Sequence, residues 1–161
     1  MHVRLATAHD GPSILAIHNH YVAHSTVIFD MVPRTAIEQD QWMADHSGAY
    51  PAVVAEDEGV VIGFGAIGSY RPRPAYAMTV EDSVYVAEGA QGRGAGTALL
   101  TELVDLAASF GYHSMIARIA GGNEASVALH ARCGFATIGV EREVGRKFNT
   151  WLDVVAMQRI L

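Results

Sequence analysis

The chain has 161 residues and a formal net charge of −6, and half of its residues are apolar. This length fits one domain with a substantial core, so residues 1–161 are expected to form a single unit. An acidic balance disfavours nucleic acid as a partner, and no apolar run reaches the roughly 20 residues that a membrane span needs. A single cysteine, Cys133, excludes an internal disulfide and favours a cytoplasmic location.

The first half of the chain predicts a strand, two helices and a hairpin. Apolar residues recur at helical spacing after Asp10, which is a suitable N-cap, and Pro33 precedes the second helix. Two β-rich runs around an acidic, glycine-containing turn predict the hairpin. The expected ranges are 3–6 for the strand, 10–21 and 35–45 for the helices, and 52–55 and 60–64 for the hairpin.

The second half alternates strands with helices. Pro72 and Pro74 interrupt the pattern before a strand, a glycine-rich loop joins that strand to a strongly apolar helix, and Gly111 ends the helix. The expected ranges are 76–86 (strand), 89–96 (loop), 97–110 (helix), 115–120 (strand), 123–134 (helix), 135–143 and 151–160 (strands). This order predicts an α/β fold with a mixed central sheet and about four helices packed on it.

The loop Gln91-Gly92-Arg93-Gly94-Ala95-Gly96 has the features of an anion site. Its glycines permit a tight turn with bare N–H groups, the following helix attracts phosphate, and Arg93 adds a positive charge. A nucleoside triphosphate would need a lysine here, and a dinucleotide would need glycine where Thr97 stands. The pyrophosphate of coenzyme A fits the spacing best. The alternative is a loop that serves only the strand-to-helix turn.

Five segments carry a resemblance that covers essentially the whole chain. They are Val80-Glu81-Asp82-Ser83-Val84-Tyr85-Val86, the loop from Gln91 to Gly96, Asn123 to His130, Cys133-Gly134-Phe135, and Gly145 to Val154. Together they resemble the GNAT N-acetyltransferases, and within them the phosphinothricin and methionine sulfone (or sulfoximine) acetyltransferase group.

The resemblance implies a GNAT fold whose sheet splays open after Val86 to admit acetyl-CoA. It implies direct acetyl transfer, in a ternary complex, to the primary amine of a small amino-acid-like acceptor, in a homodimer that uses no metal. The cofactor-binding residues that it implies are Val84, Tyr85, Val86, Gln91, Gly92, Arg93, Gly94, Ala95, Gly96, Thr97, Asn123 and Ser126.

Two side chains are candidates for acid–base catalysis. Glu81 lies in a strand, where glutamate is uncommon, and partial burial would raise its pKa toward working pH. The alternative for Glu81 is a rim carboxylate without a role, and the neighbouring Asp82 should point the opposite way. His130 lies two turns after Asn123 on one helix, so it is expected to face the same cofactor as acid or base. The sequence leaves open which of the two is the main base.

An acceptor pocket is expected from the first helix, the Arg-Pro-Arg-Pro loop and the last hairpin. The candidate acceptor residues are Phe29, Arg71, Arg73, Tyr76, Lys147 and Trp151. Cys133 stands at a helix C-terminus, which disfavours a reactive thiolate and favours a packed side chain. Two other functions remain open from the sequence: acetylation of a protein N-terminus or another small amine, and a non-catalytic sensor that binds acyl-CoA.

Overall fold

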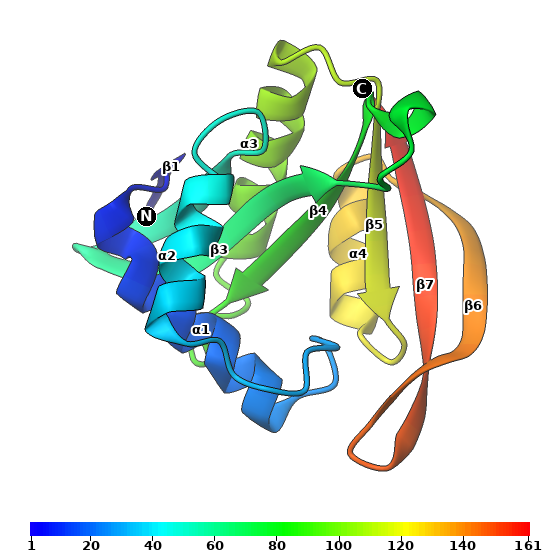
Figure 1. Cartoon of the computed structure of the whole chain (residues 1–161), viewed down its shortest axis with the longest axis horizontal. Helices are drawn as coiled ribbons and strands as arrows, with labels where there is room; N and C mark the ends of the chain where they lie inside the picture. The colour runs from blue at the N-terminus through cyan, green and yellow to red at the C-terminus, as the bar shows by residue number, and fades with distance from the viewer.

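The computed structural model describes all 161 residues as a seven-stranded sheet in the order β1-β2-β3-β4-β5-β7-β6 (Figure 1). The strands are β1 (His2–Leu5), β2 (Ala52–Asp57), β3 (Val60–Ser69), β4 (Thr79–Val86), β5 (Ser114–Ala120), β6 (Ala136–Lys147) and β7 (Thr150–Ile160). The helices are α1 (Gly11–His24), α2 (Ala36–Asp45), α3 (Ala95–Ser109) and α4 (Glu124–Arg132).

The predicted order of strands and helices is confirmed, and the differences lie at element ends. Strand β4 begins at Thr79 rather than Tyr76, because Pro74–Tyr76 forms a 3-10 turn. Proline suits the first position of such a turn, since its fixed φ matches and its missing N–H needs no partner. Strands β3 and β6 both run further than predicted, to Ser69 and Lys147.

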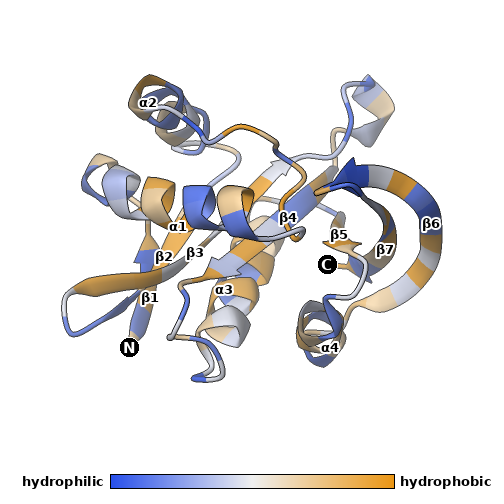
Figure 2. Ribbon diagram, turned by 90° about the horizontal axis from the view of Figure 1, so that it is seen from below, coloured by the Kyte–Doolittle hydropathy of each residue, from blue (hydrophilic) through white to orange (hydrophobic).

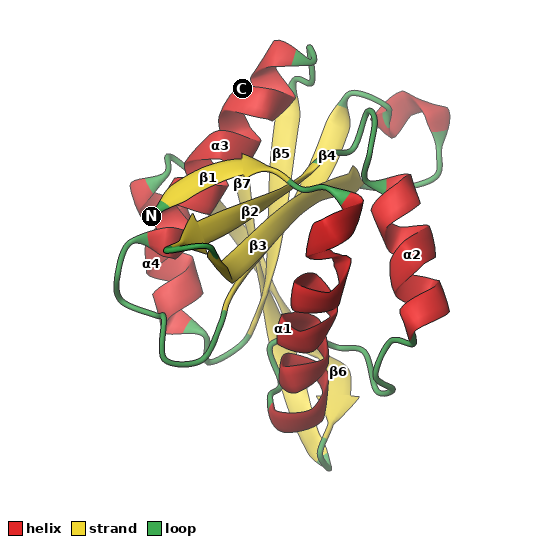
Figure 3. Cartoon of the chain, turned by 90° about the vertical axis from the view of Figure 1, so that its left-hand side faces the viewer, coloured by secondary structure: helices red, strands yellow, loops and turns green.

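Helices cover both faces of the sheet. Figure 3 shows α3 and α4 on one side and α1 and α2 on the other, and Figure 2 shows the same layers from below. The apolar stripe of α3 supplies Leu99, Leu100 and Leu103, which are fully buried in the main core. A smaller core under α1 includes Ile14 and Phe64. Because burial of apolar surface is the main stabilising term, these two layers fix the position of the central strands.

Strands β4 and β5 are paired over only part of their length and then separate. They pair in parallel only from Thr79 to Asp82, opposite Ser114 to Ala117. Beyond this point β4 stays paired with β3 and β5 stays paired with β7, so the two strands diverge, as Figure 1 shows. The predicted splayed sheet is therefore confirmed.

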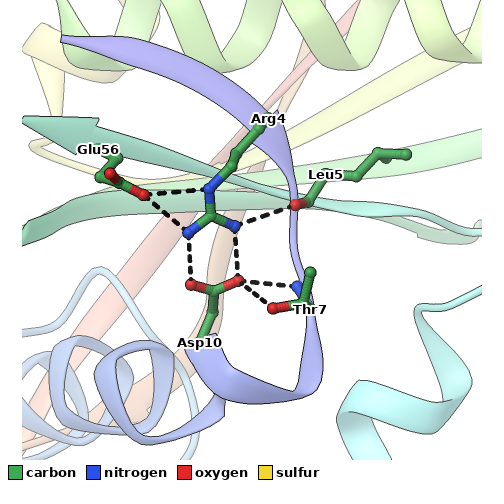
Figure 4. Close-up of polar contacts among 5 residues, drawn as sticks. All are labelled: Arg4, Leu5, Thr7, Asp10 and Glu56. Atoms are coloured by element: carbon green, nitrogen blue, oxygen red, sulfur yellow. Dashed lines mark hydrogen bonds and ion pairs between the residues drawn. The ribbon is translucent and has the colours of Figure 1, made fainter. Parts of the chain in front are cut away.

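Arg4 on β1 connects this strand to the turn before α1 and to β2 (Figure 4). Both terminal nitrogens of Arg4 donate to the Asp10 carboxylate at 2.8 Å, and Arg4 Nε and Nη2 donate to Glu56 Oε2 at 3.1 and 2.8 Å. Asp10 also accepts from the Thr7 backbone N–H at 2.8 Å. Its side chain makes no cap bond to α1, so the predicted N-cap acts instead on the preceding turn. The hydrogen bonds from Arg4 outweigh burial and lower the pKa of Asp10 to about 2.

Replacing Asp10 by asparagine tests this network. The depressed pKa stabilises the fold in full above about pH 4 and loses that contribution as pH falls toward 2. We expect Asp10→Asn to lower the free energy of unfolding by about 2 kcal/mol at pH 7 and to flatten its decline in acid. Urea melts between pH 2 and 7 measure both effects, with the exposed Asp105→Asn as control. Equal acid slopes in Asp10→Asn and the parent would contradict the assignment.

Candidate active site

A cavity of about 650 Å³ lies where β4 and β5 separate. Its walls come from β4 after its first two residues, the glycine loop, the end of β5 and one side of α4, with Tyr21 and Val27 from the N-terminal region. Segments far apart in sequence therefore meet in one hollow, which runs from the start of α3 to the acceptor face of the sheet. The acceptor face is the face of the sheet that carries Glu81.

The glycine loop presents unpaired amides to this cavity. Gly92 and Gly94 adopt φ values of 75° and 88°, a region that favours glycine. None of the N–H groups from Gln91 to Thr97 donates to another group of the chain. At Gly96 an added Cβ would lie 3.2 Å from the Leu129 side chain, so glycine permits close packing of α3 against α4. These features fit a diphosphate at the positive end of α3.

The side chain of Arg93 points away from the cavity that the loop amides face. Its Nη2 lies 2.5 Å from Asp57 Oδ2, and Asp57 also binds the N-terminal amine of Met1 at 2.9 Å. Arg93 is the one predicted loop residue that does not line the cavity. Its guanidinium instead ties the loop to the β2–β3 hairpin.

The backbone of β4 turns polar groups toward the gap, and Tyr21 occupies one of them. The N–H of Ala87 donates to Ile62 O at 2.8 Å, so the alternation of a strand points the backbone groups of Val84 and Val86 away from β3. The Tyr21 hydroxyl donates to Val86 O at 2.6 Å and accepts from Gln91 Nε2 at 2.8 Å. Tyr21 was not among the predicted site residues, because its partner Val86 is 65 positions away in the chain.

Glu81 and Asp82 point to opposite faces, as predicted, since β4 is regular there. Glu81 is half-buried and lines the cavity on the acceptor face. Burial raises the pKa of Glu81 above its ordinary value, and the positive charges of Arg118 and, more weakly, Arg71 oppose the rise. A carboxylate in this environment is suited to accept a proton near neutral pH.

Asp82 faces α4 and forms a buried pair with His130. Asp82 Oδ2 lies 3.0 Å from His130 Nε2, and the two side chains are 1% and 5% exposed. The other ring nitrogen, Nδ1, lies 2.7 Å from the backbone oxygen of Ser126. Burial alone would lower the pKa of His130, but the hydrogen bond and charge of Asp82 raise it overall. Both ring nitrogens face acceptors, an arrangement that favours the doubly protonated ring.

The six predicted acceptor residues lie outside the cavity wall. Lys147 is buried and donates to Ile28 O at 2.8 Å, and the Phe29 ring packs where a Cβ on Gly145 would stand. These contacts fasten the segment between α1 and α2, which supplies Val27 to the cavity, to the β6–β7 hairpin. Lys147 therefore connects the β6–β7 hairpin to the segment after α1 and does not line the cavity.

The remaining acceptor candidates lie on exposed surface near the ends of the strands. The Arg71 guanidinium stacks 4.9 Å from the Tyr70 ring centroid and 6.0 Å from that of Tyr76. Arg146 lies 5.3 Å over the exposed Trp151, and Arg73 is exposed. Of the acceptor candidates, only Arg71 lies near enough for its charge to lower the pKa of Glu81.

The other polar clusters show no arrangement for a metal or a covalent nucleophile. No three histidine, cysteine or acidic side chains gather as a metal would require. His18 contacts Asp30 and His20 contacts Glu88, so the two rings have different partners and do not converge on one point. Cys133 is buried at the end of α4. None of the helices combines the length and apolarity that crossing a bilayer takes.

Comparison with known proteins gives consistent matches. The sequence profile of the Acetyltransferase (GNAT) family matches residues 14–135. A phosphinothricin N-acetyltransferase of Streptomyces coelicolor is 42% identical over 163 residues, which cover 99% of this chain and 95% of that protein. An L-methionine sulfoximine/L-methionine sulfone acetyltransferase of Pseudomonas paraeruginosa is 40% identical, with coverage of 97% and 92%.

Two solved structures agree with the whole fold. A ribosomal-protein-alanine N-acetyltransferase from Brucella melitensis has a TM-score of 0.97 and 40% identity and covers 100% of both chains. A Salmonella typhimurium protein solved with its cofactor acetyl-CoA has a TM-score of 0.97 and 37% identity, with coverage of 100% of this chain and 94% of that chain. Both matches include every segment that lines the cavity.

The buried pair generates a prediction for pH dependence. Because Asp82 raises the pKa of His130, the pair stabilises the fold in full below about pH 6.5 and loses this contribution as pH rises through the folded-state value. We expect Asp82→Asn to lower the pKa of His130, measured by NMR titration of the ring proton and assigned with His130→Gln. An unchanged titration in Asp82→Asn would show that Asp82 does not hold the proton on the ring.

Proposed function

The chain belongs to the GNAT acetyltransferase family, and we propose that it moves the acetyl group of acetyl-CoA to the primary amine of a small, amino-acid-like acceptor. Membership makes it an acetyl-CoA-dependent N-acetyltransferase. The acceptor class is the proposal. The observation that carries it is the cavity between the diverging strands, with bare amides at one end and the half-buried Glu81 on its wall.

The residues of the cavity fit acetyl-CoA. The free amides of the glycine loop suit its diphosphate, and the outward backbone groups of Val84 and the N–H of Val86 suit the amides of its pantetheine arm. Asn123 uses its side-chain oxygen to cap α4 at Ser126, so its amide NH₂ is free for the same arm. When bound, acetyl-CoA supplies an acetyl group activated as a thioester.

Glu81 is assigned as the general base. An amine is protonated at neutral pH, so a group of the enzyme must remove a proton before the nitrogen can attack. Glu81 faces the cavity on the acceptor face, and burial raises its pKa above the ordinary value of a glutamate. Holding the amine beside this carboxylate also supplies orientation, which accounts for a large part of the rate in transfer reactions.

His130 is assigned a positioning role. A base needs a ring nitrogen with a free lone pair, and both nitrogens of His130 are within hydrogen-bond distance of the acceptors Asp82 Oδ2 and Ser126 O. The ring instead joins α4 to β4 at the point where the gap opens. This geometry supports Glu81 over His130 as the main base, a choice that the sequence left open.

The acceptor class rests on the relatives. The names phosphinothricin N-acetyltransferase and L-methionine sulfoximine/L-methionine sulfone acetyltransferase describe small amino-acid-like acceptors. The alternative acceptor is a protein N-terminus, which the name of the Brucella melitensis protein favours. A carboxylate on the cavity wall is an argument against a non-catalytic sensor, because binding of acyl-CoA needs no base.

A homodimer and a cytoplasmic location are also proposed. Strand β6 forms the outer edge of the sheet, and large apolar side chains are exposed on β6 and β7 and at the turn between them. They are Ile138, Val140, Val144, Phe148 and Trp151. Such a surface suits burial against a second copy. Light scattering of the purified protein measures the mass that tests this proposal. The single buried cysteine is compatible with a reducing compartment.

Removing the base tests the mechanism. We expect Glu81→Gln to lower kcat by about 10²- to 10⁴-fold, the range typical of a lost general base. Acetyl-CoA affinity, measured by calorimetry, should stay within twofold or so, because Glu81 is not among the groups that suit the cofactor. The parent should gain activity as pH rises through the raised pKa of Glu81. The exposed Glu58→Gln is the matched control, and near-parental kcat in Glu81→Gln would reject Glu81 as the base.

A thiol-release assay tests the acceptor class. The panel is phosphinothricin, methionine sulfone, methionine sulfoximine, unmodified amino acids, polyamines and a peptide, each with acetyl-CoA. We expect release with the small amino-acid-like amines and little with the peptide. Release with the peptide alone would favour the protein N-terminus, and no release with any amine would favour the sensor.

A further inference from the structure

One cation on the cavity wall is explained neither by the base nor by the cofactor site. Arg118 follows Ala117, the last residue of β5 that pairs with β4, so it stands where the gap opens. Glu81 lies opposite Ile116 in this register, and Arg118 is two residues further along the same face of β5. Both Glu81 and Arg118 line the cavity. A permanent positive charge thus stands beside the proposed base on the acceptor face.

The guanidinium of Arg118 is held by a carboxylate from another strand. Arg118 Nη2 forms an ion pair with Glu141 Oε2 on β6. Strand β7 lies between β5 and β6, and the residue that it places opposite Arg118 is the small Ala156. The side chains of Arg118 and Glu141 are 34% and 42% exposed. Ion pairs this open to water contribute little to stability, so another carboxylate can replace Glu141 at low cost.

We infer that Arg118 binds the α-carboxylate of the acceptor in place of Glu141 and thereby selects free amino acids over peptide N-termini. This inference rests on the proposed function and deepens it by naming the acceptor's second contact. In an α-amino acid the carboxylate is attached to the same carbon as the amine. An amine placed at Glu81 therefore carries its carboxylate into the region of the neighbouring cation.

The chemistry of the pair favours this selection. A guanidinium binds a carboxylate through two parallel hydrogen bonds, which fixes orientation as well as position. An acceptor carboxylate beside Glu81 alone would meet repulsion from a like charge, and Arg118 offsets that repulsion. A peptide N-terminus or an amino-acid amide has a neutral carbonyl in place of the carboxylate. It makes a weaker bond to Arg118 and leaves the Glu141 pair in place.

The test compares an amino acid with its amide, for example methionine sulfone and methionine sulfone amide, in the full-length enzyme. We expect Arg118→Met to lower kcat/KM for the acid about 10- to 100-fold, mainly through KM, and to leave the amide within about threefold. Arg118→Lys should recover part of the loss. Rates are taken on the plateau of each pH profile, because loss of Arg118 also raises the pKa of Glu81.

Two further variants complete the design. Glu141→Gln removes the internal competitor and should lower the KM for the acid. Arg142→Met is the matched control, because Arg142 adjoins Glu141, is 79% exposed and pairs with Asp153. Equal losses for acid and amide in Arg118→Met, or a higher KM for the acid in Glu141→Gln, would overturn the inference. If the parent acetylates acid and amide but Arg118→Met matches it on both, only this inference fails. If the parent acetylates no amine, the proposed function fails first.

Discussion

The short pairing between β4 and β5 is the constraint on which the site depends. A strand that leaves its neighbour exposes backbone N–H and C=O groups, and such groups are costly when they lack partners in a partly buried place. Here the neighbouring strands keep β4 and β5 apart, because β3 pairs with β4 as far as Val86 and β7 pairs with β5 as far as Ala120. The unpaired backbone of β4 is thus a stable feature of the fold, available to a ligand rich in amide groups.

Strand alternation separates two carboxylates that adjoin in sequence. Asp82 turns inward and forms a buried pair with His130, whereas Glu81 turns to the cavity with a raised pKa. Removing one partner from a buried pair leaves an uncompensated charge, so the loss of either side chain would destabilise the fold. The face with Glu81 can vary in its surrounding charges, such as Arg118, without disturbing the core. Chemistry and packing are therefore divided between the two faces of one strand.

The sequence predicted the features that depend on residues adjacent in the chain. The glycine loop, the Asn123 cap and the opposite directions of Glu81 and Asp82 follow from local geometry and are present in the structure. Contacts between distant segments were not predictable, because spacing within a strand or helix says nothing about them. Tyr21 meets Val86 across the sheet. Lys147 was predicted as an acceptor residue, but its ammonium is buried against a carbonyl from a segment far upstream.

That buried lysine has a consequence for the order of assembly. Lys147 and Ile28 are 119 positions apart, so the wall next to Val27 closes only after nearly the whole chain has left the ribosome. Contacts of such long sequence separation form slowly, since the loop between them must be ordered first. The main core around α3 is also completed late, because Met157 of β7 belongs to it. In a nascent chain the two sides of the cavity would therefore be completed together, when the C-terminal hairpin joins the sheet.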